Sequence, residues 1–142
     1  MTVREIVDKI IEKTGVEPLP EDKTCDNLMT GSWAMEVKGV VTTFMATVDV
    51  IKEASALGAN FIITHEPTWF SGADDTEWLL EDPVYLEKKK LIEENHIAIW
   101  RFHDHMHMDK EDGIYRGFDE ELGWGKYRVK CEGELGWVWR SL

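Results

Sequence analysis

Asn-Phe-Ile-Ile-Thr-His-Glu-Pro, residues 60–67, is the stretch that decides the fold, together with its counterpart at residues 97–107, Ile-Ala-Ile-Trp-Arg-Phe-His-Asp-His-Met-His. Each stretch begins with a short run of apolar, β-branched and aromatic residues, which is typical of a buried strand. Each run then changes abruptly into side chains that can bind metals. If both strands belong to one parallel sheet, these changes fall at the same edge, where open α/β sheets bind ligands. The sequence therefore predicts a metal site at that edge.

Helical spacing of apolar side chains predicts the elements around these strands. The expected helices cover residues 3–14, 47–57, 83–95 and 113–122. Polar caps and glycines mark their ends, such as Thr2 before the first helix and Gly123 after the last. On the helix over 83–95, the apolar and therefore buried side is expected to be Val84, Leu86, Leu91 and Ile92.

The expected strands alternate with these helices and cover residues 37–45, 60–64 and 97–102. Short loops join the first strand, its helix and the second strand, as expected of a right-handed parallel crossover. We therefore predict an α/β fold in which helices flank a central, mostly parallel sheet in a three-layer arrangement. By its length the chain, residues 1–142, is expected to be a single domain.

The composition argues against several classes of function. The chain has 16 lysines and arginines against 28 aspartates and glutamates, a formal net charge of −12. This balance gives no general attraction for nucleic acids or for anionic membrane surfaces. No apolar run approaches the roughly 20 residues of a membrane span, and the first residues do not have the pattern of a signal peptide. Two widely separated cysteines, Cys25 and Cys131, favour a reducing compartment, so we expect a cytoplasmic protein.

Most of the histidines gather where the two deciding strands end. Four of the five lie there, and two carboxylates stand among them: His65, Glu66, His103, Asp104, His105 and His107. Neutral imidazoles and carboxylates are the usual protein ligands of zinc, iron and manganese. Because alternate residues of a strand share one side, we expect His103, His105 and His107 to project together for as long as the strand conformation lasts.

Each of these residues also has a purely structural interpretation. A single histidine at a strand end is more often a hydrogen-bonded structural residue, whereas the His-x-His-x-His spacing favours metal binding. Glu66 is balanced between a metal ligand or general base and a salt-bridge partner, and Asp104 is expected beside the metal or at the surface. The Asp26-Asn27 pair is interpreted mainly as polar loop residues. A cysteine-based zinc site is disfavoured because neither cysteine has a partner at ligand spacing.

Three motifs together resemble one known family. Cys25-Asp26-Asn27-Leu28 with Gly31 resembles an early Trp-Asp-Asn-x-Gly-Leu-x-x-Gly segment. Residues 37–67 resemble a strand–helix–strand unit that ends in His-His-Pro, and here it ends in His65-Glu66-Pro67. Residues 97–123 resemble a strand followed by His-x-x-x-Asp and later by Leu-Gly, and here the pair is His103-x-x-x-His107. On these motifs, residues 1–123 resemble the Nif-three-like dinuclear metal proteins, often labelled GTP cyclohydrolase I type 2 homologues.

This resemblance implies a ligand set and a function. His65 and Glu66 stand where the family's paired histidines bind two metal ions, His107 stands where an aspartate binds, and His103 matches a further histidine of the family. The resemblance thus implies one or two divalent ions, of zinc, iron or manganese. It also implies a hydrolase for a small phosphorylated or heterocyclic, nucleotide-like molecule, and a homo-oligomer of the kind that forms hexameric rings in the family.

The resemblance leaves the remaining ligands and the activity open. Family members are longer and carry a His-x-x-x-Glu pair near their C-termini, whereas this chain has no histidine after His107. We therefore expect a short or truncated member, or one whose remaining ligands come from water or from another subunit. One hypothesis is a metal-dependent hydrolase in which Glu66 or Asp104 moves the proton. The alternative is a non-catalytic, metal-binding oligomer that acts as an adaptor or metal carrier.

Overall fold

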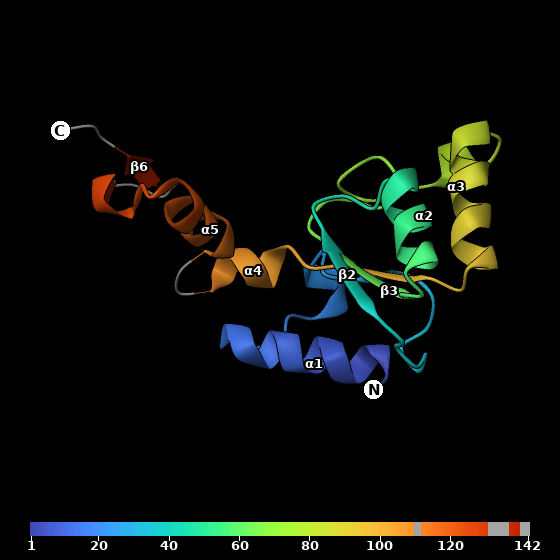
Figure 1. Ribbon diagram of the computed structural model, residues 1–142, viewed down its shortest axis with the longest axis horizontal. Coiled ribbons are helices and arrows are strands. Elements are labelled where there is room, and N and C mark those ends of the chain that lie inside the picture. The colour runs from blue at the N-terminus through green and yellow to red at the C-terminus, as the bar shows by residue number, and fades with distance from the viewer. Residues whose placement is uncertain (110–111, 131–136, 140–142) are drawn as a thin grey trace.

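Strand β3, Phe61–Thr64, lies inside the main sheet because its side chains are apolar or β-branched on both faces. Phe61, Ile62 and Thr64 are almost completely buried, and so is every residue of the neighbouring strand β4, Ala98–Arg101. Strands buried on both faces are expected in parallel sheets that helices cover on each side. The computed structural model, which describes residues 1–109, 112–130 and 137–139, has this arrangement (Figure 1).

The main sheet has four strands in the order β1-β4-β3-β2. Its outer strands are β1, Leu28–Thr30, and β2, Val40–Thr43. Strands β2, β3 and β4 run parallel, whereas β1 is antiparallel to β4. The prediction of a mostly parallel α/β sheet is confirmed. The sequence did not indicate β1, and the strand expected over 37–45 is shorter than predicted.

Helices cover both faces of the main sheet. On one face lies α1, Val3–Thr14, which buries Val3 and Val7 against Phe61, Ala98 and Trp100. On the other face lie α2, Val48–Ala56, and α3, Pro83–Glu94, whose buried apolar residues include Ile51, Ala54 and Ile92. Figure 1 shows the sheet between α1 and these two helices, which gives the three expected layers.

The predicted caps form at the helix ends. The Thr2 side chain accepts from the Glu5 N–H while the Glu5 carboxylate accepts from the Thr2 N–H, so α1 begins with a reciprocal capping box. At α2 the Thr47 side chain accepts the Val50 N–H, and at α3 the Asp82 carboxylate accepts the N–H groups of Val84 and Tyr85. Among the described residues, no helix is long and apolar enough to cross a membrane.

The predicted buried side of α3 is wrong in part. Val84 and Leu86 are exposed, whereas Tyr85 and Ile92 are buried. The reason is the preceding loop, which places Trp69 against Tyr85 with their ring centroids 4.9 Å apart. This contact draws Tyr85 inward and leaves the neighbouring apolar residues on the outer side.

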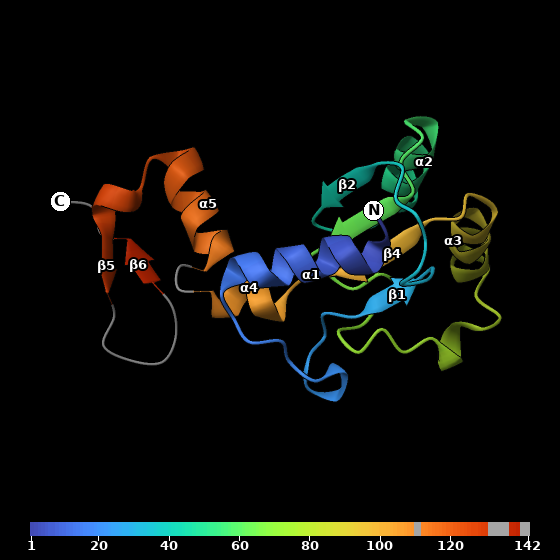
Figure 2. The ribbon, with the colours of Figure 1, turned by 90° about the horizontal axis from the view of Figure 1, so that it is seen from below.

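Beyond the main sheet, the chain continues through α4, Asp104–Met108, and α5, Gly113–Leu122. The antiparallel pair of β5, Arg128–Lys130, and β6, Trp137–Trp139, follows. Short 3-10 turns lie at Glu21–Lys23, Glu77–Leu79 and Gly125–Tyr127. Figure 2 shows α4, α5 and the β5–β6 pair extending away from the main sheet. The predicted helix over 113–122 is confirmed.

Candidate metal centre

One buried carboxylate, that of Asp26, fixes the backbone just after β4. Its Oδ1 accepts the N–H groups of His103 (2.6 Å) and Asp104 (2.8 Å), and its Oδ2 accepts the N–H of His105 (3.0 Å). These three N–H groups lie at the start of α4, where a helix has no internal acceptors for them. Asp26 is therefore a buried anchor of this helix, and its interpretation as an ordinary polar loop residue is wrong.

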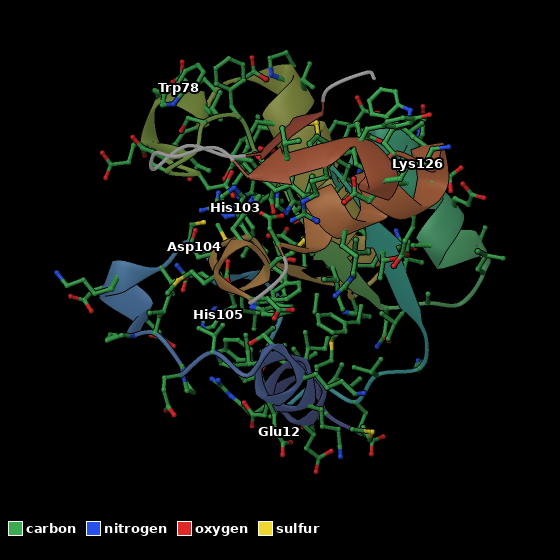
Figure 3. The ribbon with its side chains drawn as sticks, turned by 90° about the vertical axis from the view of Figure 1, so that its left-hand side faces the viewer. Glu12, Trp78, His103, Asp104, His105 and Lys126 are labelled. Atoms are coloured by element: carbon green, nitrogen blue, oxygen red, sulfur yellow. The ribbon has the colours of Figure 1, made fainter. Side chains whose placement is uncertain are left out.

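The same anchor corrects the expected conformation of residues 103–107. They are not extended, because β4 ends at Arg101 and α4 begins at Asp104. In a helix, residues four apart lie on one side, so His103, at the helix start, and His107 face the same way. His105 lies on the other side, toward α1 (Figure 3). The expectation that all three histidines project together is therefore wrong for His105.

His105 has a structural role in the described chain. It is buried, its Nδ1 lies 2.6 Å from Asp26 Oδ2, and its Nε2 accepts the Leu19 N–H at 3.2 Å. Because Nε2 accepts, the proton of the neutral ring is on Nδ1 and is donated to Asp26. Both ring nitrogens are thus used within the fold.

His65, His103 and His107 form a compact group, which we call the three-histidine group. One ring nitrogen from each lies within 4.8 Å of the other two. The ring centroid of His65 is 4.5 Å from that of His103 and 5.0 Å from that of His107, and the last two are 4.6 Å apart. His65 follows the end of β3, His103 precedes the first residue of α4, and His107 lies within α4, all at the predicted edge of the sheet.

The surroundings of the three rings fit a metal ion. Each Nδ1 lies against an oxygen acceptor: Phe102 O for His65 (3.3 Å), Asp104 Oδ1 for His103 (2.9 Å) and Asp112 Oδ2 for His107 (2.7 Å). Each Nδ1 therefore carries the proton, and each Nε2 keeps its lone pair. Histidines that bind metals almost always donate their other N–H to an oxygen in this manner.

The electrostatics of His65 favour the neutral, metal-binding form. Burial, followed by the charge of the neighbouring His103, lowers the pKa of His65 below its ordinary value. A neutral imidazole is the form that offers a lone pair to a cation. The fold thus supplies three imidazoles at a partly buried edge without a buried positive charge on His65.

Asp104 lies behind His103 and is held by several donors. Its Oδ2 accepts from Thr24 Oγ1 (2.9 Å) and from the Cys25 N–H (2.8 Å). Its Oδ1 accepts from His103 Nδ1 and from the Cys25 thiol (3.2 Å). Burial by itself raises the pKa of Asp104, but these hydrogen bonds more than reverse that effect and hold the pKa well below its usual range. The carboxylate is ionised and orients the His103 ring.

Glu66 is not brought into the three-histidine group. Its backbone N–H donates to Phe44 O at 2.9 Å, which fixes the turn after β3, and its side chain is half-buried. Its carboxylate belongs to neither group of converging ligand atoms among the described residues. Its predicted roles as ligand and as proton acceptor stay predictions.

The structure also places two residues beside the site that sequence spacing did not indicate. Cys25 lies next to His103 and Asp104, and its partner Asp104 is 79 positions away in the chain. Burial, with the Asp104 hydrogen bond, raises the pKa of the Cys25 thiol to about 11. Arg101 is buried and donates to Cys25 O (2.7 Å) and to Gly72 O (2.8 Å), so it ties two loops to the end of β4.

The fold and these side chains define a class of protein: an α/β protein with clustered imidazoles and carboxylates at the carboxyl edge of its sheet. A sequence model of the family Duf34/NIF3 (NGG1p interacting factor 3) matches residues 1–140. The chain therefore belongs to this family, and the resemblance stated from its motifs is confirmed.

Named relatives support the same assignment. The chain is 32% identical over 120 residues to a "GTP cyclohydrolase 1 type 2 homolog" of Clostridium acetobutylicum, a match that covers 84% of this chain and 43% of that protein. It is 29% identical over 108 residues to a protein of the same name from Staphylococcus epidermidis, which covers 75% of this chain and 28% of that protein. The chain thus spans less than half the length of these curated relatives.

Solved structures agree with the fold. The crystal structure of a Bacillus cereus protein related to NIF3 matches 87% of this chain and 33% of its own, with a TM-score of 0.67 and 26% identity. The reduced HcgD protein of Methanocaldococcus jannaschii matches 82% of this chain and 46% of its own, with a TM-score of 0.57 and 26% identity. In both comparisons the match covers less than half of the solved chain.

Proposed function

We infer that the chain binds a divalent transition-metal ion through the Nε2 atoms of His65, His103 and His107, and that it acts as a metal-dependent hydrolase. The substrate class is a small phosphorylated or heterocyclic, nucleotide-like molecule. The single observation that carries this proposal is that all three converging rings donate Nδ1–H to an oxygen. Zinc, iron and manganese are the ions that this donor set suits, and zinc and iron suit it best.

Three imidazoles leave room for a substrate or water on the ion. Catalytic zinc sites typically have three protein ligands and one open position. When bound, such an ion supplies Lewis acidity. It polarises a carbonyl or phosphoryl oxygen, and it lowers the pKa of a water molecule bound to it to near neutrality. His107 is exposed, so this side of the group is accessible from solvent.

The two carboxylates take different parts in this proposal. The oxygens of Asp104 already accept four hydrogen bonds, so this carboxylate serves mainly to orient His103. Glu66 follows His65 directly and has a half-buried side chain, so it is the better acceptor for a proton and a further ligand where a second ion binds. We therefore assign the transfer of the proton to Glu66 first and to Asp104 second.

Elemental analysis of the purified protein tests the metal. We expect at least one metal ion per chain in the wild type and one ion fewer per chain in His65→Ala/His107→Ala. The matched control is His96→Asn, because His96 lies outside both groups and asparagine tolerates its left-handed backbone, φ 50°. Metal that is absent from the wild type, even after dialysis against zinc, iron or manganese, would contradict the proposal.

Turnover separates the enzyme from the alternative. We expect metal-dependent hydrolysis of a generic phosphoester that is lost in His65→Ala and weakened in Glu66→Gln. Metal binding without turnover would favour the adaptor or metal carrier.

One observation gives that alternative weight: Phe44 is exposed while its ring stacks beside His65, with centroids 5.6 Å apart. An exposed aromatic ring beside the site suits a subunit contact, so light scattering is expected to report a homo-oligomer, and a hexamer would match the family resemblance.

A further inference from the structure

Cys25, His103 and Asp104 form a second group of side chains that can bind a metal, which shares only His103 with the three-histidine group. Their ligand atoms lie within 4.8 Å of one another, and all three residues are half-buried. Asp104 Oδ1 is the meeting point, because it accepts from the Cys25 thiol at 3.2 Å and from His103 Nδ1 at 2.9 Å. A cation that replaces the thiol hydrogen of Cys25 and the Nδ1 hydrogen of His103 has three ligand atoms around it: a sulfur, a nitrogen and an oxygen. These are the atoms of a mixed-ligand zinc or iron site.

The backbone holds this group in place before any ion binds. Asp26 follows Cys25 in the chain and accepts the N–H groups of both His103 and Asp104. Cys25 itself donates its N–H to Asp104 and accepts from Arg101 Nε at its carbonyl oxygen. Hydrogen bonds thus join residues 25–26 to residues 101–104 on both sides of the group. A site organised in this way pays little ordering entropy when it binds its ligand.

We propose that Cys25 Sγ, His103 Nδ1 and Asp104 Oδ1 hold a second metal ion, of the thiophilic kind such as zinc, iron(II) or cobalt(II). The proposal goes beyond the hydrolase proposed above, because it requires neither turnover nor Glu66. A thiolate ligand selects zinc and iron over manganese and magnesium, which prefer oxygen. The proposal therefore predicts that the protein retains zinc or iron in preference to manganese or magnesium, and that it holds a second ion.

Binding exchanges protons for the ion and transfers no electrons. The thiol proton of Cys25 leaves to solvent as the sulfur–metal bond forms. His103 gives up its Nδ1 proton as the nitrogen–metal bond forms and takes up a proton on Nε2 where that nitrogen is free, so the ring stays neutral and one proton is released in all. The ionised Asp104 contributes an oxygen lone pair without losing a proton. If Nε2 of His103 held the ion of the three-histidine group at the same time, neither ring nitrogen would keep a proton and two protons would be released in all.

Titration of the metal-free protein with cobalt(II), followed by absorption spectra and by elemental analysis after desalting, tests the proposal. We expect a thiolate-to-cobalt charge-transfer band in the near ultraviolet and two cobalt ions per chain. Cys25→Ser is expected to lose the band and one ion, whereas Cys131→Ser, the matched control at the other cysteine, keeps both. His107→Ala is expected to keep the band while the three-histidine group loses its ion.

The outcomes separate this proposal from the proposed hydrolase. A band that is missing in the wild type, or that persists in Cys25→Ser, overturns the Cys25 site. One cobalt ion with nitrogen and oxygen ligands alone overturns it and leaves the three-histidine site standing, whereas no bound cobalt overturns both. If Cys25→Ser fails to fold, X-ray absorption of zinc-loaded Cys131→Ser decides. A sulfur neighbour at about 2.3 Å supports the site, and its absence overturns it.

Discussion

At the scale of single residues, Asp26 decides where the site residues stand. Its two oxygens accept three backbone N–H groups and the Nδ1–H of His105 in a buried position, where charge-assisted hydrogen bonds are strong. In Asp26→Asn the charge is lost and an amide N–H₂ faces donors that then have no acceptor. We expect the free energy of unfolding to fall by about 3 kcal/mol, measured by urea denaturation.

The neighbouring residue provides the control for this prediction. Asn27 makes one side-chain hydrogen bond, from Nδ2 to Thr24 O at 3.1 Å, so Asn27→Ala is expected to cost only about 1 kcal/mol. Equal losses in the two variants would contradict the special role of Asp26.

A second single residue, Asp104, is expected to set the metal affinity of the three-histidine group. It accepts from His103 Nδ1 and so fixes the ring and its tautomer. Loss of such a partner typically weakens metal binding roughly 10–100-fold. We expect this loss in Asp104→Asn, measured by competition with a chelating indicator in a Cys25→Ser background that removes the second group. Asp49→Asn, an exposed change in the first turn of α2, is expected to leave the affinity unchanged.

At the scale of elements, α3 holds the loop over residues 68–82 through a half-buried lysine. Lys88 Nζ donates to Thr68 O and lies 5.6 Å above the Trp69 ring. Burial lowers the pKa of Lys88 in the folded state, so folding penalises its charged form. The penalty is present at pH 7 and is relieved as the pH rises from the folded-state pKa to the unfolded value of about 10.4.

Helix α3 allows a prediction about how the stability of two lysine variants changes with pH. As the pH rises through this alkaline window, the wild type is expected to gain stability relative to Lys88→Met. Lys90 is largely exposed on the same helix, so Lys90→Met is expected to show no such pH-dependent difference. Urea denaturation at several pH values between neutral and alkaline measures both, and identical pH profiles for the two variants would contradict the prediction.

Elements also show how far the sequence alone could go. The apolar runs before His65 and His103 predict β3 and β4, because hydrophobic pattern is a local signal. The turn of the chain into α4 is not local, since the carboxylate that caps it comes from Asp26, 79 positions before His105. The same distance hides Cys25 from any search by ligand spacing. Sequence reasoning therefore located the edge and three of its histidines, and it missed the contacts that orient them.

At the scale of the whole molecule, α4, α5 and the β5–β6 pair extend beyond the main sheet (Figure 2). The three-histidine group brings a residue at the end of β3 against residues of α4. His65 belongs to the sheet and His107 to α4. The His107 ring donates to Asp112, and Asp112 caps α5 by accepting the Ile114 N–H at 2.9 Å. A metal ion on His65 and His107 therefore connects the sheet to the first turn of α5 through one continuous set of contacts.

This connection predicts that metal binding slows local opening of α5. Amides of residues 113–122 are expected to exchange with deuterium more slowly in the zinc-loaded protein than in the metal-free protein, because opening of the helix must then disturb a bound ligand. Asp112→Asn is the matched variant, since asparagine caps a helix as well as aspartate does but offers His107 a weaker acceptor. In that variant the zinc-dependent protection of α5 is expected to shrink while the protection of β3 persists. If the α5 amides exchange at the same rate in the zinc-loaded and the metal-free wild type, the metal stabilises the sheet alone. Helix α5 is then anchored by contacts independent of His107.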